Sequence, residues 1–131
     1  MMSKKEFYDF LEEIGGLIPA RSELPHPISL FGIECDDGWL ELIAELIREL
    51  IAKGWTRETM QIKEKFGGLR FYATGLPEGG GELIMRFGQL SYTVCELCGS
   101  KDNVKLRGTS WVKTLCDVCT EPWLNRHKRF L

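Results

Sequence analysis

Four of the five cysteines of this chain stand in two Cys-x2-Cys pairs near the C-terminus, and this spacing constrains the fold more than any other feature. Cys95 and Cys98 form the first pair and Cys116 and Cys119 the second, with seventeen residues between the pairs. Two residues between paired cysteines let the chain turn tightly, so that both sulfurs reach one Zn²⁺ ion at about 2.3 Å. We expect a structural zinc ion with these four ligands, because four thiolates leave no coordination position open for a substrate.

The residues between the two pairs have the pattern of a short hairpin. Apolar residues flank the sequence "RGTS", which we predict to be the turn. The strand residues expected to pack inward are Val104 and Leu106 before the turn, and Trp111, Val112 and Leu115 after it.

The sequence "TEPWLNRHKRFL" after the last cysteine predicts a terminal helix. Thr120 is the expected N-cap, and Pro122 would lie in the first turn, where its missing N–H does no harm. Trp123, Leu124 and His127 would then pack against the rest of the module. We take residues 95–131 as a zinc-finger module packed on a core domain formed by residues 1–94.

A hairpin and a helix around one ion resemble the treble-clef class of zinc finger. The spacing Cys-x2-Cys-x17-Cys-x2-Cys also matches the GATA-type DNA-binding finger, and "TLCDVC" with Trp111 nearby looks similar to it over residues 95–124. The GATA pattern continues from its last cysteine with glycine and a basic tail, whereas this chain continues "TEPW". The resemblance therefore implies a treble-clef fold and does not reach the residues that contact DNA.

Other roles for the cysteine cluster fit the sequence less well. A catalytic zinc site keeps an open position and usually includes a histidine or carboxylate ligand, and a redox dithiol needs only one Cys-x2-Cys pair. His127 could replace a cysteine as ligand or pack as a core histidine, and four available cysteines favour the second. Residues 95–131 contain few apolar side chains, so metal binding, worth about 10–16 kcal/mol in small fingers, would be needed to hold them together.

The first 94 residues predict an α+β domain in which three helices pack on a β-hairpin. Apolar residues recur at helical spacing in three stretches. The first covers residues 4–14, the second runs from an N-cap at Asp37 to Gly54 at its C-terminal end, and the third covers residues 82–94. The connection over residues 18–35 is predicted to be irregular and to cross the core at Leu30 and Phe31. With 44% hydrophobic and 27% charged residues, the composition is that of a globular protein.

The stretch "MQIKEKFGGLRFYAT" alternates with period two around Gly67 and Gly68, which predicts a β-hairpin with these two glycines as the turn. Lys65 would then lie opposite Arg70. One face of the hairpin is apolar apart from Glu64. The other face is polar and consists of Lys63, Lys65, Arg70 and Tyr72.

The polar face of the hairpin is the candidate partner-binding surface. Like charges opposite each other, such as Lys65 and Arg70, lower the stability of the hairpin unless a nearby acid or an anionic partner compensates the charge. The face is either a solvated surface neutralised by neighbouring acids, or a docking surface for an acidic protein or a phosphate backbone, on which Tyr72 could stack. Glu64 needs a partner if it is buried, and we expect Arg86 to supply it. A catalytic role for Glu64 would need a second acid, a nucleophile or a phosphate loop beside it.

Other candidate site residues have simpler explanations. Cys35 could be a nucleophile, but Asp36 and Asp37 beside it would raise the pKa of its thiol, which favours a buried thiol and helix capping over catalysis or metal binding. His26 lies between two prolines, where we expect a surface histidine rather than a general base.

Three stretches in order, "FGIECDDGW", "QIKEKFGGLRFYATG" and "SYTVCELCG…TLCDVC", resemble a family of small uncharacterised proteins found in phages and prophages. The resemblance covers most of residues 30–119, and "KEKFGGLRFY" is its most distinctive part. It implies a phage or mobile-element setting without indicating an activity. In that setting, a protein that binds a host protein, including an inhibitor of a bacterial defence system, is a natural expectation.

Charge and hydropathy narrow the function further. The formal net charge is −2, but residues 95–131 carry seven Lys and Arg against four Asp and Glu. No basic-then-apolar leader opens the sequence, and no apolar run reaches the roughly 20 residues that span a bilayer, so we expect a soluble cytoplasmic protein of the bacterial host cell. We predict a non-enzymatic binding protein. The alternatives are a nucleic-acid-binding zinc finger and, third, a hydrolase whose site is not recognised.

Overall fold

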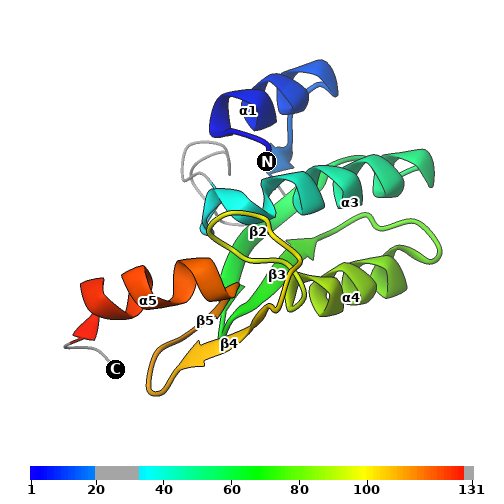
Figure 1. Ribbon diagram of the computed structural model, residues 1–131. Coiled ribbons are helices and arrows are strands. Elements are labelled where there is room, and N and C mark those ends of the chain that lie inside the picture. The colour runs from blue at the N-terminus through cyan, green and yellow to red at the C-terminus, as the bar shows by residue number, and fades with distance from the viewer. Residues whose placement is uncertain (20–32, 129–131) are drawn as a thin grey trace.

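The computed structural model of the chain describes residues 1–19 and 33–128 (Figure 1). The described residues have an α+β fold, with a cluster of four cysteines at its C-terminal end. Its elements in chain order are α1 (Lys4–Glu13), β1 (Ile18–Pro19), the 3₁₀ helix η1 (Asp37–Trp39), α3 (Leu40–Ala52), β2 (Glu58–Lys65), β3 (Gly68–Ala73), α4 (Gly80–Ser91), β4 (Lys105–Gly108), β5 (Val112–Leu115) and α5 (Asp117–Arg126).

Two small sheets carry the strands. The larger has the order β1-β2-β3, with β1 parallel and β3 antiparallel to β2, and the smaller is the β4–β5 hairpin. The segment predicted to be irregular therefore contains a short strand, because Ile18 pairs with Glu58 and Pro19 with Thr59. The predictions for His26, Leu30 and Phe31 fall outside the described residues.

The helices form over the predicted stretches, but α3 does not begin where we expected. The α1 helix starts with a capping box, in which Ser3 and Glu6 accept each other's backbone N–H. Asp37 was predicted to cap α3; instead it lies inside η1, and the N-cap residue of α3 is Trp39, whose side chain makes no capping hydrogen bond. The reason is tertiary, because the backbone N–H groups of Asp36 and Gly38 bind Glu96 and hold this segment away from capping geometry.

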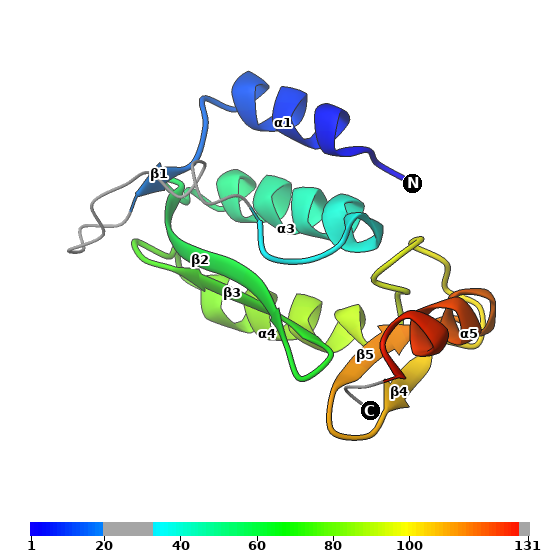
Figure 2. The same cartoon turned by 90° about the vertical axis from the view of Figure 1, so that its left-hand side faces the viewer.

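The core of residues 1–94 lies between the helices and one face of the larger sheet. The α3 helix lies between α1 and the sheet, and α4 packs on β3 and α3 (Figure 2). The most deeply buried side chains come from α1, η1, α3, β2, β3 and α4, and include Phe7, Trp39, Ile43, Ile47, Leu50, Ile62, Phe71 and Phe87. Burying a large apolar side chain contributes about 1.5–3 kcal/mol, so this cluster supplies the main stabilisation of the helical layers.

The β2–β3 hairpin forms with a turn one residue earlier than predicted. Phe66 and Gly67 are the loop residues, with φ of 54° and 83°, and Lys65 pairs with Gly68. The like-charged pair is therefore Lys63 opposite Arg70, not Lys65 opposite Arg70. Apart from one irregularity in the register, each residue of the paired strands faces a partner two positions earlier than predicted, and an even shift leaves its side chain on the predicted face of the sheet.

Tertiary contacts account for this placement of the turn. The carboxylate of Glu64 accepts the N–H of Gly67, and the carbonyl of Gly67 accepts the hydroxyl of Thr114 from β5. The two-residue loop thus contains a phenylalanine before Gly67, and the positive φ of this phenylalanine costs about 1–2 kcal/mol. Phe66 itself was placed on the apolar face by the sequence pattern, but its side chain is 71% exposed.

The third predicted helix, over residues 82–94, is shifted toward the N-terminus. The α4 helix begins inside the glycine run that separates it from β3 and ends at Ser91. Val94 is buried beyond the helix end, and Leu90, expected on the apolar face, is 41% exposed. The early end follows from the hydroxyl of Ser91, which accepts the N–H of Leu69 on β3 and fixes the chain where it turns toward the cysteines.

The C-terminal module has a hairpin followed by a helix, as predicted, but the turn and the helix bounds differ. Arg107 and Gly108, predicted to be in the turn, pair within the hairpin, and Leu106 and Trp111, predicted to pack inward, are 51% and 38% exposed. The α5 helix begins directly after Cys116, so Thr120 is not its N-cap; its hydroxyl instead donates to the carbonyl of Cys116. Pro122 consequently lies inside the helix rather than in its first turn. The early start places Cys119 in the first turn, where its sulfur lies beside that of Cys116.

Candidate metal centre

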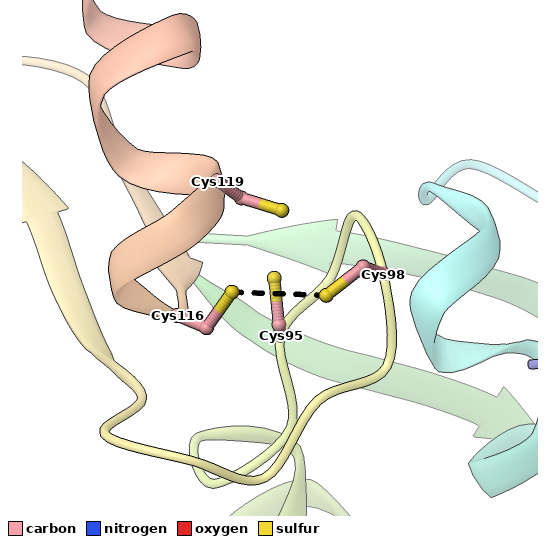
Figure 3. A group of neighbouring side chains, drawn as sticks. All are labelled: Cys95, Cys98, Cys116 and Cys119. Atoms are coloured by element: carbon pink, nitrogen blue, oxygen red, sulfur yellow. Dashed lines mark hydrogen bonds between the residues drawn. The ribbon is translucent and has the colours of Figure 1, made fainter.

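The four paired cysteines come together from two parts of the C-terminal module (Figure 3). Cys95 and Cys98 lie in the turn that follows α4, where the N–H of Gly99 donates to the carbonyl of Cys95. Cys116 is the N-cap of α5, and Cys119 lies in the first turn of that helix. A tight turn and a helix N-terminus therefore present two sulfurs each to one point.

The separations of the sulfurs suit a tetrahedral metal ion. All four Sγ atoms lie within 4.8 Å of one another, and those of Cys98 and Cys116 are 3.7 Å apart. A tetrahedron of sulfurs at about 2.3 Å from a central ion has edges of about 3.8 Å. The cluster can therefore hold one metal ion with four sulfur ligands. Cys95 and Cys116 are buried and Cys98 is exposed, so the site opens toward the surface on the side of Cys98.

The surroundings of the thiols also point to a cation. Burial raises the pKa of the Cys119 thiol, and the hydrogen bonds with Cys98 and Cys116 raise it further. Burial alone would raise the pKa of Cys116 as well, but hydrogen bonds with Cys119 and Cys98 lower it, so the protein groups alone do not favour ionisation of all four thiols. A coordinated metal ion reverses this, because its charge deprotonates a coordinating thiol outright.

The first cysteine turn is packed directly on the core through η1. The backbone N–H of Gly38 donates to the carbonyl of Glu96 at 2.7 Å, and the indole N–H of Trp39 donates to the carbonyl of Val94 at 2.8 Å. A Cβ at Gly38 would lie 2.2 Å from the carbonyl oxygen of Cys95, so only glycine permits this approach. The segment "DDGW" is therefore the contact between the core and the candidate metal centre.

A buried ion pair strengthens the same contact. Glu96 is 1% exposed; its Oε2 accepts the N–H of Asp36, and its Oε1 faces the Lys113 ammonium at 3.1 Å, outside hydrogen-bond geometry. Burial raises the pKa of Glu96, which the Lys113 charge only partly offsets. Burial alone would lower the pKa of Lys113, but the hydrogen bond to Asp36 and the charge of Glu96 raise it. Asp36 thus contacts the finger through Lys113 and Glu96, whereas the sequence predicted a helix-capping role for it.

A second contact joins the hairpin tip of the core to the finger. The hydroxyl of Thr114 donates to the carbonyl of Gly67 at 2.6 Å, and the backbone carbonyl of Thr114 accepts the N–H of Glu96. The side chain of Leu106 fills the space where a Cβ of Gly67 would stand, 2.2 Å from its Cδ2. Figure 2 shows the tip of β2–β3 beside the β4–β5 hairpin.

His127 packs as an aromatic side chain and is absent from the cysteine cluster. Its ring lies 4.7 Å from that of Trp111 and 5.6 Å from that of Trp123, centroid to centroid. Trp123 is 2% exposed and is the largest buried side chain of the finger core, which also includes Leu115. These aromatics cover the side of the module where α5 meets β5.

The residues predicted for partner binding alternate along β2 and β3 with the buried Ile62, Leu69 and Phe71, so they share the opposite face of the larger sheet. Lys65 and Tyr72 are exposed, and Lys63 and Arg70 are half-buried. Within residues 1–19 and 33–128, none of the three cations forms an ion pair, although the backbone of Glu34 pairs with Lys63. The structure thus gathers these residues on one face, with Lys63 directly opposite Arg70.

The surroundings of Glu64 and Cys35 indicate structural roles for both residues. The expected pair of Glu64 with Arg86 is wrong, because Arg86 bonds to Glu49 and Glu64 accepts the N–H of Gly67. The thiol of Cys35 has a raised pKa, first because of burial and then because of the charges of Glu96 and Asp36. The predicted effect of the carboxylates on Cys35 is confirmed, although burial is the larger cause.

Comparisons with protein-family models, with curated proteins and with solved structures found no match. None of the helices in the described parts of the chain is long and apolar enough to cross a membrane.

Sequence inspection missed both contacts between the core and the finger. The usable signal was a glycine directly before a tryptophan in "DDGW" and a glycine pair after an aromatic residue in "KFGGL", since small residues mark places of close backbone approach. Glu96, inside the first cysteine pair, and Lys113, before the second, were the charged residues to connect.

Proposed function

We propose that this protein is a zinc-stabilised, non-enzymatic binding protein that docks on an acidic surface of a host protein. The observation that carries the proposal is the face of Lys63, Lys65, Arg70 and Tyr72, whose cations have no ion pair within the described parts of the chain. Two like charges directly opposite each other on a sheet are unfavourable. Glu34, the β-bridge partner of Lys63, lies on one side of this pair, and a partner with clustered carboxylates would supply the anionic groups for Lys65 and Arg70.

Zinc is the proposed metal because of the donor set. Four cysteine sulfurs at tetrahedral separations are typical of structural zinc sites. Zinc has no redox chemistry, which suits a purely structural role. Four protein ligands leave no position for water or substrate, which supports a structural role over a catalytic one. The position of Glu64, engaged with the hairpin turn, further supports a non-enzymatic protein.

The partner is proposed to be a protein of a bacterial host. The similarity of "KEKFGGLRFY" and its flanking motifs to phage and prophage proteins supports this setting, and inhibition of a bacterial defence system is the role we propose within it. The net charge of −2 and a sequence pI near 5.7 lack the overall basic charge of a dedicated nucleic-acid binder, which favours a protein partner.

Affinity capture with charge-reversed variants tests the proposal. The metal-loaded protein is immobilised and exposed to bacterial lysate, and retained proteins are identified by mass spectrometry for the wild type and for Lys65→Glu with Arg70→Glu. We expect a partner with an acidic surface that the double variant loses. The matched control is Lys101→Glu with Arg126→Glu, two exposed finger cations reversed in the same way. Equal retention by both double variants would contradict the proposed face.

Nucleic-acid binding is the second candidate, favoured by cations that form no ion pair with the described residues and by the 42% exposed Tyr72 beside them. It predicts a binding constant that falls steeply as salt rises from about 50 to 200 mM, because neutralised phosphates release counterions. A labelled single-stranded oligonucleotide titrated at low salt decides this, and an unchanged signal removes the candidate.

A further inference from the structure

The tip of the β2–β3 hairpin exposes an aromatic side chain at a position unsuited to it. Phe66 has a φ of 54° and is 71% exposed, and Gly67 follows with a φ of 83°. A two-residue loop with positive φ at both positions favours Asn-Gly or Gly-Gly, and a bulky residue there is an outlier. Neither packing nor backbone conformation explains a phenylalanine at this position. Residues held in strained conformations are concentrated at functional sites.

The finger places a second exposed apolar side chain against Gly67, the residue that follows Phe66. Leu106 of β4 is 51% exposed, and its side chain lies against Gly67, the neighbour of Phe66. The hydrogen bond from Thr114 to Gly67 fixes the hairpin tip on the finger. We refer to Phe66, the chain neighbour of Gly67, and Leu106, whose side chain lies against Gly67, as the apolar pair; the two residues come from parts of the chain that meet only when the finger is folded and docked.

The surroundings of the apolar pair are basic. The Lys65 ammonium lies 5.5 Å from the centroid of the Phe66 ring, and the exposed Lys105 precedes Leu106. The nearest acid in sequence, Glu64, is engaged by the N–H of Gly67. Lys63 and Arg70 extend the positive charge along the sheet away from the tip.

We infer that the apolar pair Phe66 and Leu106, with Lys65 beside it, is the docking site for an acidic peptide segment that carries a large apolar side chain. This inference rests on the proposed function and names the chemistry of the partner. The apolar side chain contacts Phe66 and Leu106, and the carboxylates around it face Lys65 and Lys105. Exposed aromatic anchors of this kind carry a large share of the binding energy of protein interfaces. An aliphatic leucine offers no stacking surface for a base, which favours a peptide.

A displayed library of random short peptides, selected on the full-length zinc-loaded protein, tests this inference. The decisive variant is Phe66→Asn, because asparagine tolerates positive φ and suits the turn. We expect the selected peptides to combine Asp or Glu with a large apolar residue. We also expect Phe66→Asn to weaken their binding at least about tenfold while its melting temperature stays equal or rises. Leu106→Thr should weaken the same peptides, since threonine keeps the strand but removes the apolar contact.

The outcomes separate this inference from the proposed function. Acidic peptides that lose binding to Lys65→Glu with Arg70→Glu but bind Phe66→Asn as tightly as the wild type would leave the basic face standing and overturn the apolar docking site. Selection without enrichment of acidic peptides would overturn both. Two other outcomes would also overturn the inference, in each case with no peptide selected. If Phe66→Asn abolishes binding of a single-stranded oligonucleotide, the pair binds nucleic acid. If it abolishes self-association in sedimentation, the pair binds a second copy of the chain.

Discussion

The Lys113 ammonium lies 3.1 Å from the carboxylate of Glu96 and 2.7 Å from that of Asp36, where the finger meets the core. The side chain of Glu96 is 1% exposed, so water cannot replace the cation. Removing one partner of a buried ion pair costs about 3–5 kcal/mol, because the other charge stays buried and unpaired. We expect Lys113→Met to lower the free energy of unfolding by about 3 kcal/mol in urea denaturation of the metal-loaded protein.

Two further variants control this measurement. Glu96→Gln combined with Lys113→Met removes both charges and should recover part of the loss. Lys101→Met, at an exposed position, should change stability by less than about 0.5 kcal/mol. A double variant that is less stable than Lys113→Met would mean that the ion pair is not the reason for the loss.

Gly38 provides a steric test of the contact between core and finger. A Cβ there would lie 2.2 Å from the carbonyl oxygen of Cys95 and 2.5 Å from that of Glu96, and backbone atoms cannot rotate away. We expect Gly38→Ala to cost at least about 3 kcal/mol in thermal or urea unfolding, at the upper end of overpacking effects. Gly81→Ala is the control: a Cβ on this helical glycine meets nothing within 4 Å, so stability should stay equal or rise by up to about 1 kcal/mol. Equal effects of the two substitutions would contradict the close approach.

Removal of the metal should unfold the finger. Metal binding in small fingers is worth about 10–16 kcal/mol, which is comparable to the whole net stability of a domain, about 5–15 kcal/mol. We expect elemental analysis to find one zinc per chain, and expect chelation or Cys116→Ser to abolish cooperative unfolding of residues 95–128. Cys35→Ser, which changes the cysteine outside the cluster, should keep the full zinc content. Purified protein that is metal-free and fully folded would refute the structural role of the ion.

Cys35 should react slowly with thiol reagents. Its pKa is raised by burial and by the charges of Glu96 and Asp36, so the reactive thiolate is scarce. We expect iodoacetamide to label Cys35 of the metal-loaded protein at least about tenfold more slowly than the same cysteine in denaturant. The difference should persist at pH 9, where a free thiol with a pKa of about 8.5 is mostly ionised. Labelling by mass spectrometry at equal rates in both states would contradict the burial of this thiol.

The predictions from sequence were accurate where local spacing carries the information. The alternation around "KFGGL" predicted the faces of the β2–β3 hairpin correctly, because a turn shifted by one residue preserves the alternation of sides. It placed the turn at Gly67 and Gly68, since two glycines are the strongest local signal. Gly67 is instead held by Glu64, three residues earlier on β2, and by Thr114 on β5, and the second of these partners cannot be found from local sequence.

The predicted starts of two helices were wrong for a related reason. Asp37 and Thr120 have the side chains of good N-caps, but neighbouring segments take precedence over this local preference. Asp36 and Gly38 bind Glu96, and Cys119 must lie in the first turn of α5 to reach the other sulfurs. Capping is worth about 1 kcal/mol, which is less than the contacts that compete with it.

The sequence by itself determined the class of fold, the three amphipathic helices of the core, the alternation of the hairpin and the four sulfurs that gather at one point, because each depends on residues close together in the chain. Only the tertiary structure decided how the finger sits on the core. The buried pair of Glu96 and Lys113, the close approach at Gly38 and the contact of Leu106 with Gly67 each join segments that are distant in sequence. Such contacts form when whole elements pack together, and no local pattern encodes which distant residue will be the partner.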